Sequence, residues 1–423
     1  MINENTDNLR KKHIAMYIGS LNKGGAERVM CNLAEYFNKR GFRVTLVTTY
    51  LADDEYEVAG ANWIREDDFA KNGDALNEGY HALDVLSPED APRRVYVKQS
   101  EDTGINRVFS ALMPDERKGR VSNFVGRVGK LRAIWKALEP DLILSFLGKN
   151  NVMAIYSARG LGIPVVVSVR SNPSREYAAK GLNMAMNVLF KRAAGVVVQT
   201  TGARDYFKES IRKKCVILPN SVHQSFMNEE ITEFEDREKT IVSVGRLDDN
   251  KNQILLIRAF GKIMDKHPEY RLVLYGDGPS RKKFESAADS LMKDANKGAI
   301  TFMGNASDIP AKIKSAGIFV LSSKQEGMPN ALIEAMSLGI ACVSTDCPCG
   351  GPRDLIYNNE NGILIPMGSD EEMTDTLADA LLKLTEDNDF RKKLSENALE
   401  VRKLYSPDRI NGLWEEYFNK LMK

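Results

Sequence analysis

Several residue types are scarce in this chain of 423 residues. Its five cysteines form an odd, sparse set, which argues against a disulfide framework and predicts a reducing compartment. No apolar run approaches the roughly 18 residues that span a bilayer. The opening MINENTDNLRKK also lacks the apolar core of a signal peptide. The sequence therefore predicts a cytoplasmic protein without a membrane-spanning helix.

Residues that commonly bind catalytic metals are also few. Cys347 and Cys349 lie in CPCGG, but no second cysteine pair or nearby histidine completes a metal site. The four histidines are scattered, so no nucleophile with a histidine base can be assembled from the sequence. We expect neither a metal nor any other cofactor.

Charge is balanced overall but uneven along the chain. Residues 1–225 contain 33 Lys and Arg against 25 Asp and Glu, which gives +8, and the remainder contains 26 against 33, which gives −7. The N-terminal half therefore suits an anionic partner, such as a membrane surface or a phosphorylated substrate. Chance clustering is the alternative explanation.

Residues 117–136 hold seven of these cations and no acid, with apolar residues at helical spacing. They form either a basic helix that meets anionic lipid or a helix that packs its apolar face inside the domain. The cations expected to contact lipid are Arg117, Lys118, Arg120, Arg127, Lys130, Arg132 and Lys136, helped by Lys11 and Lys12.

Short β-rich runs alternate with helical stretches, and the chain is too long for one core. The runs expected as strands are HIAMYIG, RVTLVTT, LILSF, PVVVSV, GVVVQT and CVILP, then TIVSVG, RLVLYG, AITFMG, GIFVLSS, IACVST and GILIP. We predict an α/β fold of two facing, doubly wound Rossmann-like domains, 1–225 and 226–405. An irregular insertion is expected at about 50–118, and a terminal helix at 406–423 that packs back on the first domain. Ligands bind at the carboxyl ends of such strands, so the site is expected in the cleft between the domains.

The stretch VSVGRLDDNKN delivers two cations to the end of a strand. Gly245 ends the strand, and Arg246 and Lys251 follow on the loop and the start of the next helix. A pyrophosphate at this edge would be held by a guanidinium fork and an ammonium group. The alternative is that both are solvated surface cations.

The stretch SSKQEGMPNALIEAMSLG places two glutamates around the start of a helix. Pro329 suits the first helical position and Gly339 the end, so Glu326 and Gly327 lie in the preceding loop. Backbone N–H groups there favour anions or hydroxyl oxygens. Glu326 and Glu334 are expected to touch two parts of one extended ligand. Alternatively, Glu326 is a capping carboxylate and Glu334 a surface residue.

In combination these motifs resemble a known family. G-R-L-x-x-x-K-N, followed by E-G-M-P-N-A-L-I-E-A-M and TDCPCGGPRDLI, is similar to the retaining glycosyltransferases of family four, which have the GT-B fold. SLNKGGAERV, SFLGKNN, SVRSNP and LPNSV also fall where that family has similar segments. The resemblance covers nearly the whole chain apart from about 50–118, and it is greatest for members that build bacterial surface polysaccharides.

The resemblance implies a role for each matching residue. Arg246 and Lys251 would hold the diphosphate of a nucleotide-sugar, expected to be a UDP-sugar, and stabilise the leaving group. Glu326 would contact hydroxyls of the donor sugar, and Glu334 the ribose. The backbone would line the donor at Gly25, Gly327, Met328, Pro329 and Asn330. By the same resemblance, residues 1–225 bind the acceptor and residues 226–405 the donor.

Arg170, in SVRSNP, departs from the family's pattern, because many members have a histidine there. Arginine stays protonated and cannot act as a general base. We expect Arg170 to pair with a phosphate or to orient a sugar hydroxyl, and so to belong with the catalytic residues. The alternative is a structural role, bonding carbonyls at the strand end.

The resemblance thus implies a retaining, metal-independent hexosyltransferase that uses a glycan or lipid-linked glycan as acceptor. Peripheral contact with an anionic membrane at its inner face is expected, and nucleic acid is not expected as a partner. The alternatives are another GT-B nucleotide-sugar enzyme, such as an epimerase or phosphorylase, or a non-catalytic nucleotide-sugar-binding regulator. A dehydrogenase is disfavoured, because GSLNKGGAE lacks the G-x-G-x-x-G spacing after the first strand.

Overall fold

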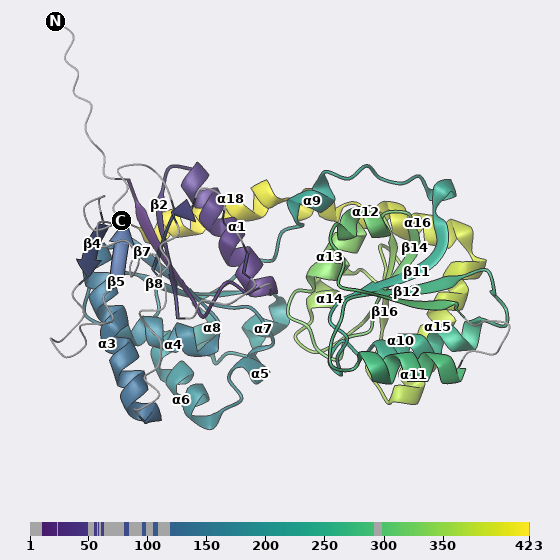
Figure 1. Cartoon of the computed structure of the whole chain (residues 1–423), viewed down its shortest axis with the longest axis horizontal. Helices are drawn as coiled ribbons and strands as arrows, with labels where there is room; N and C mark the ends of the chain where they lie inside the picture. Colours follow the sequence, from purple (N-terminus) through teal and green to yellow (C-terminus); the bar gives the residue numbers. More distant parts are fainter. Residues whose placement is uncertain are drawn as a thin grey trace, which may run out of the picture. The chain divides into compact units, whose positions relative to one another are not determined.

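The computed structural model divides the chain into two compact units (Figure 1). Unit 1 consists of Met1–Val198, Phe207–Val216 and Asn411–Lys423, and unit 2 of Gln199–Tyr206 and Ile217–Ile410. The structure describes residues 11–22, 24–49, 55–56, 58, 61–62, 80–83, 95–98, 105–108, 119–291 and 298–422.

Unit 1 is built on an eight-stranded sheet with the order β10-β9-β8-β7-β1-β2-β6-β3. The pairs from β9 to β3 are parallel. Its strands are β1 (His13–Ile18), β2 (Arg43–Thr48), β3 (Ala61–Asn62), β6 (Ile105–Val108), β7 (Leu142–Phe146), β8 (Val165–Val169), β9 (Gly195–Val198) and β10 (Cys215–Ile217). A separate antiparallel pair consists of β4 (Tyr80–Leu83) and β5 (Val95–Lys98).

The helical segments of unit 1 are α1 (Gly25–Lys39), α3 (Arg120–Leu138), α4 (Gly148–Ser157), α5 (Pro173–Glu176), α6 (Lys180–Leu189), η3 (Phe190–Arg192) and α8 (Glu209–Arg212). The terminal helix α18 (Pro407–Leu421) adds most of its length to this unit. Its Phe418 ring stacks on Phe37 with the ring centroids 5.2 Å apart. Its Glu415 accepts a hydrogen bond from the Tyr36 hydroxyl at 2.8 Å, so α18 is fixed against α1.

Unit 2 is built on a six-stranded parallel sheet with the order β13-β12-β11-β14-β15-β16. Its strands are β11 (Glu238–Val244), β12 (Arg271–Tyr275), β13 (Ile300–Gly304), β14 (Ala316–Leu321), β15 (Ala341–Thr345) and β16 (Ile363–Ile365). Its helical segments are α7 (Thr201–Asp205), α9 (Gln224–Met227), η4 (Phe234–Asp236), α10 (Gln253–Ile263), α11 (Arg281–Leu291), α12 (Ile309–Ile313), α13 (Asn330–Ser337), α14 (Gly351–Leu355), α15 (Asp370–Glu386), α16 (Asn388–Ala398) and α17 (Val401–Leu404).

The central strands of both sheets are buried along their whole length, as β1, β7, β14 and β15 illustrate. Strands covered on both faces read as continuous apolar runs, which is why they were recognisable in the sequence. The prediction of two doubly wound α/β domains is confirmed. Among the described residues, no helix combines the length and the apolarity needed to span a bilayer.

The structure differs from the expectation of an irregular stretch at 50–118, because β3, β4, β5 and β6 all lie within it. Within it, β6 extends the unit 1 sheet beside β2 and is buried along its length. Its Arg107 is 2% exposed and forms an ion pair with Glu55 at 2.6 Å and hydrogen bonds to the Thr48 hydroxyl. A four-residue strand with a charge at its centre carries no clear period, so sequence reasoning missed it.

Candidate functional site

The two cations predicted for unit 2 lie on the loop between β11 and α10, at the carboxyl edge of the sheet. Asp248 organises this loop. Its carboxylate accepts hydrogen bonds from the backbone N–H of Asn250 at 3.0 Å and of Lys251 at 2.8 Å, and from Arg246 Nε at 2.8 Å. Burial opposes ionisation of Asp248, but these hydrogen bonds prevail and lower its pKa. Asp248 therefore fixes both candidate cations, a role that was not anticipated from the sequence.

Lys251 contacts Glu326, which lies 75 residues further along the chain, on the loop between β14 and α13. The Lys251 ammonium is 2.6 Å from Glu326 Oε1, and the Ser323 hydroxyl donates to the same oxygen at 2.6 Å. The side chains of Lys251 and Glu326 remain 25% and 12% exposed. An ammonium group has three donors, so Lys251 can hold this carboxylate and an anionic ligand together.

Two glycines of YGDGPSR contact the backbone of the loop that carries Arg246 and Lys251. A Cβ on Gly276 would lie 2.1 Å from the carbonyl oxygen of Gly245, and one on Gly278 would lie 2.4 Å from that of Leu247. Any side chain at either position would displace the loop that carries Arg246. The glycines thus permit close backbone approach, and this fits the interpretation of a tight strand-to-helix turn.

The Glu326 loop is held by residues from two other segments. Asn220, in LPNSV, donates from Nδ2 to Asn330 Oδ1 at 2.7 Å and to the Met328 carbonyl at 3.3 Å. Gln199 Nε2 donates to Asn220 Oδ1 at 2.7 Å, which fixes the amide. Sequence reasoning noted LPNSV only as a matching segment and gave Asn220 no role.

A further support comes from the loop after β15. A Cβ on Gly351 would lie 1.6 Å from the Gly327 carbonyl oxygen, so the backbones touch there and only glycine fits. In the same loop Cys347 is buried, and burial raises the pKa of its thiol to about 12. This thiol is therefore protonated at neutral pH and suited neither to nucleophilic attack nor to metal binding.

Helix α13 begins at Asn330, one residue later than expected, with Pro329 as its N-cap. It ends at Ser337, and Gly339 follows with φ +66°, a conformation that glycine adopts without strain. Glu334 lies within this helix and is 7% exposed, so it is a buried residue and not the surface residue of the alternative interpretation.

Gly25 and Arg170, the other two predicted site residues, lie in unit 1. Gly25 is the first residue of α1. Arg170 directly follows β8, is 8% exposed, and has its guanidinium carbon 5.0 Å from the centroid of the Phe146 ring. Burial lowers the pKa of Arg170 to about 9, and the charge of Glu176 opposes this shift. Arg170 thus remains largely protonated at neutral pH.

Glu176 is a half-buried carboxylate that sequence reasoning did not single out. It accepts hydrogen bonds from the Ser171 hydroxyl at 2.7 Å and from the Gly148 N–H, at the start of α4, at 2.8 Å. Burial raises its pKa, although these hydrogen bonds act in the opposite direction. Glu176 ties the Arg170 loop to the N-terminus of α4.

The structure therefore brings Arg246, Lys251, Glu326 and Asn330 to one edge of the unit 2 sheet, whereas Gly25 and Arg170 belong to unit 1. In the part of the chain that the structure describes, no group of three or more His, Cys, Asp or Glu side chains is placed to hold a metal ion.

Two family models match the chain and together cover most of it. The one described as "Glycosyl transferase 4-like domain" matches residues 24–221, and the one described as "Glycosyl transferases group 1" matches residues 226–401. The chain therefore belongs to the glycosyltransferase family that these two models describe.

Curated relatives of this glycosyltransferase include two Campylobacter jejuni enzymes. One is an N-acetylgalactosamine-N,N'-diacetylbacillosaminyl-diphospho-undecaprenol 4-alpha-N-acetylgalactosaminyltransferase, 24% identical over 94% of this chain and 96% of the relative. The other is an alpha-1,4-N-acetyl-D-galactosaminyltransferase whose name gives a glycan on PP-undecaprenol, 29% identical over 67% of this chain and 76% of the relative.

Solved structures show the same fold. Anabaena HepE in complex with UDP and glucose has a TM-score of 0.69 and 17% identity, covering 97% of this chain and all of that one. A glycosyltransferase from Rickettsia africae has a TM-score of 0.70 and 16% identity, covering 98% and 99%. The expected GT-B architecture of two Rossmann-like domains is thus confirmed.

Proposed function

We propose that this glycosyltransferase transfers a sugar from a UDP-sugar to a lipid-linked glycan, with retention and without a metal, in cell-surface polysaccharide synthesis. The observation that carries the proposal is the contact between Lys251 and Glu326. It lies at the carboxyl edge of the unit 2 sheet, where Arg246 also lies. A cation suited to a diphosphate touches a carboxylate suited to sugar hydroxyls, so one ligand with both groups matches this edge.

The donor is proposed to lie along this edge. Arg246 and Lys251 bind the diphosphate, because together they supply a planar fork and a point charge. Glu326 bonds the sugar and Glu334 the ribose, while the backbone of residues 327–330, with Gly25 from unit 1, lines the ligand. The complex of HepE with UDP supports uridine as the base.

Retention is supported by the names of relatives. An Escherichia coli relative, 25% identical over 58% of this chain and 67% of its own length, is a UDP-Gal:alpha-D-GlcNAc-diphosphoundecaprenol alpha-1,3-galactosyltransferase. We propose that the acceptor hydroxyl attacks the anomeric carbon on the face that the diphosphate leaves. The bond between that carbon and the phosphate oxygen breaks, and the hydroxyl proton passes to the departing phosphate. Arg246 and Lys251 stabilise the negative charge that develops there.

The acceptor is proposed to bind residues 1–225, and the donor residues 226–405. The Campylobacter relatives act on glycans carried by diphospho-undecaprenol, a membrane lipid. A comparable acceptor would place this enzyme at the cytoplasmic face of a membrane. Arg170 would then orient an acceptor hydroxyl or a phosphate, since its guanidinium is charged at neutral pH.

The test is a transfer assay on the full chain with a panel of UDP-sugars and a short-chain polyprenyl diphosphate glycan. We expect one UDP-sugar to be consumed and an α-linked product to be seen by NMR. Activity should survive EDTA, because two fixed cations already neutralise the leaving group. Loss of activity in EDTA with recovery in magnesium or manganese contradicts metal independence. Conversion of the donor sugar alone would indicate an epimerase, and donor binding without turnover a regulator.

A further inference from the structure

Helix α6 of unit 1 presents apolar side chains to solvent on one face. Met184 and Val188, four residues apart, are 73% and 56% exposed. Side chains at this spacing lie one above the other on a helix. The exposed Lys180 precedes them and the exposed Lys191 follows on η3, so cations flank the apolar pair at both ends.

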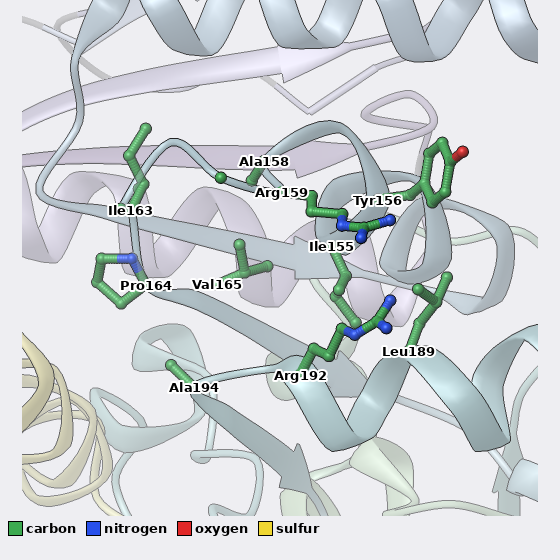
Figure 2. Close-up of a pocket in the computed structure, with 12 residues that line it drawn as sticks. Ile155, Tyr156, Ala158, Arg159, Ile163, Pro164, Val165, Leu189, Arg192 and Ala194 are labelled. Carbon is green, nitrogen blue, oxygen red and sulfur yellow. The ribbon is translucent and has the colours of Figure 1, made fainter.

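A pocket of about 300 Å³ lies at the C-terminal end of α6, where Leu189 lines it, between the end of α4, the start of β8 and η3 (Figure 2). Arg159 and Arg192 are the two charged residues that line it, and Tyr156, 47% exposed, stands at its edge. Among the residues that the structure describes, neither guanidinium forms an ion pair. Two unneutralised arginines around one small cavity suit a phosphate group.

The surrounding chain has almost no negative charge to compete. Residues 147–198 contain seven cations, Lys149, Arg159, Arg170, Arg175, Lys180, Lys191 and Arg192, against one acid, Glu176. The Glu176 carboxylate is half-buried and already bonded to Gly148 and Ser171. The surface over α4, α6 and η3 is therefore basic, and Met184 and Val188 are apolar points on it.

We propose that α6, η3 and the Arg159–Arg192 pocket form a docking surface for an anionic lipid bilayer. Met184, Val188 and Tyr156 enter the interface, and the two arginines bind the phosphodiester of a lipid headgroup. Exposed apolar residues between basic ones are the pattern of helices that lie in the membrane interface. The proposal deepens the proposed function by naming the surface on which the enzyme meets its membrane-bound acceptor.

The position of α6 fits this role. Its Leu182 lies 3.6 Å from where a Cβ on Gly148 would be, so its first turn reaches the carboxyl edge of the sheet. Arg170 lies at that same edge, directly after β8. The Arg159–Arg192 pocket lies at the opposite, amino edge of the sheet, beside the start of β8, so α6 spans from that pocket to the edge where an acceptor is expected.

Helix α3, which the sequence singled out as the basic helix, packs its C-terminal half inside the domain, whereas Phe124 and Val125 in its N-terminal half are 44% and 62% exposed. Its Leu131 and Trp135 are buried in unit 1. Its Arg132 donates to the carbonyl oxygens of Ser157 at 3.0 Å and Arg159 at 2.6 Å, so that cation is used within the domain. The alternative of a packed domain helix therefore describes this half of α3. Arg117 and Lys118 lie outside the described residues, as does the side chain of Arg120.

The experiment is co-sedimentation of the full chain with vesicles of phosphatidylcholine, with and without phosphatidylglycerol. We expect binding that needs phosphatidylglycerol and falls as the salt concentration rises from about 0.1 M to about 1 M, where screening is strong. The double variant R159Q/R192Q should bind about thirtyfold more weakly, which corresponds to about 2 kcal/mol for two cations. M184S/V188S should also lose binding, since the apolar contacts are removed.

Matched controls lie in unit 2. K266Q/K282Q removes the same charge from exposed positions, and M303S/Y357S removes two exposed apolar side chains. Both should bind vesicles as the unchanged protein does. Equal losses in the controls, or no binding of the unchanged protein at low salt, overturn the proposal.

One further measurement distinguishes a lipid headgroup from free phosphate as the bound anion. Another distinguishes failure of the docking proposal from failure of the proposed function. Titration with inorganic phosphate shows whether Arg159 and Arg192 bind a free anion; phosphate binding without vesicle binding overturns the membrane assignment. Hydrolysis of the UDP-sugar donor is measured on every variant and should be unchanged, because none of these residues lies at the donor edge. Vesicle binding without any sugar transfer by the unchanged protein would defeat the proposed function alone.

Discussion

Each unit places a cation and a carboxylate beside the carboxyl end of a strand, but the two cations differ in exposure. In unit 1, Arg170 is 8% exposed and Glu176 is half-buried, and burial shifts the pKa of each toward its neutral form. In unit 2, Lys251 and Glu326 stay partly exposed, and the neighbouring Arg246 side chain is 70% exposed.

The difference shows which charges can meet a ligand. The Glu176 carboxylate accepts hydrogen bonds from Gly148 and Ser171, and a carboxylate bonded in this way fixes the backbone around it. A charge at the surface that is oriented by neighbours, as Lys251 is by Glu326, can exchange water for a ligand at little cost in reorganisation. The comparison predicts that changes at Lys251 and Glu326 act on the donor, whereas changes at Arg170 and Glu176 leave donor binding intact.

The largest effect is expected for Glu326→Gln. The sugar contact and part of the orientation of Lys251 are lost, so transfer should fall by roughly 10²–10³, as for other preorganised polar groups. UDP affinity, measured by calorimetry, should be retained. Glu334→Gln is the matched variant and should weaken UDP itself. Identical profiles for the two variants would defeat this division of roles.

Next in size are Arg246→Ala and Lys251→Ala. Each removes a charge-assisted contact of about 1.5–3 kcal/mol, so UDP affinity should fall roughly ten- to a hundredfold. Calorimetry with UDP and with uridine separates the diphosphate from the nucleoside, since uridine binding should change little. Unchanged UDP affinity in both variants would contradict the assignment of the diphosphate to this loop.

Arg170→Met tests the other side of the comparison. Transfer should fall about tenfold, the equivalent of one modest polar contact, while UDP affinity stays as in the unchanged protein. Arg170→Lys keeps the charge but not the planar fork, and it should recover only part of the activity. A loss of UDP affinity in Arg170→Met would show that the donor also depends on Arg170.

Asn220→Ala sharpens the comparison within unit 2. It removes the hydrogen bonds to Asn330 and the Met328 carbonyl, so the Glu326 loop loses a support without losing a charge. We expect kcat to fall roughly fivefold, about 1 kcal/mol, with little change in UDP affinity. Asn228→Ala, at an exposed asparagine bonded to Gln224, is the control. Equal effects of the two substitutions would argue against the proposal that Asn220 supports the Glu326 loop.

The smallest effect is expected for Glu176→Gln and concerns stability as a function of pH. The folded state raises the pKa of this carboxyl, so its contribution to stability is fully present below about pH 4.5 and is lost as pH rises through the raised pKa. The amide has no such titration. Urea unfolding between about pH 4 and pH 8 should therefore show the variant gaining stability relative to the unchanged protein as pH rises. A constant difference across that range would show that Glu176 is not perturbed.

The sequence by itself determined the two α/β domains and which polar residues follow the strands of unit 2. Buried parallel strands are short apolar runs, and the residues that follow them fall at the carboxyl edge whatever the rest of the fold does. That is why Arg246, Lys251 and Glu326 could be placed from GRLDDNK and QEGMPN alone.

Only the tertiary structure decided which of these residues touch and what holds them. The partners Lys251 and Glu326 are 75 residues apart, and Asn220 and Asn330 are 110 apart, so no local period encodes either contact. Strand β6 lies in a segment without a strand pattern, and its pairing with β2 and its contact between Arg107 and Glu55 are both long-range. Tertiary packing also decided exposure. Leu131 and Met184 are both apolar residues on helices, but Leu131 is buried and Met184 is exposed to water.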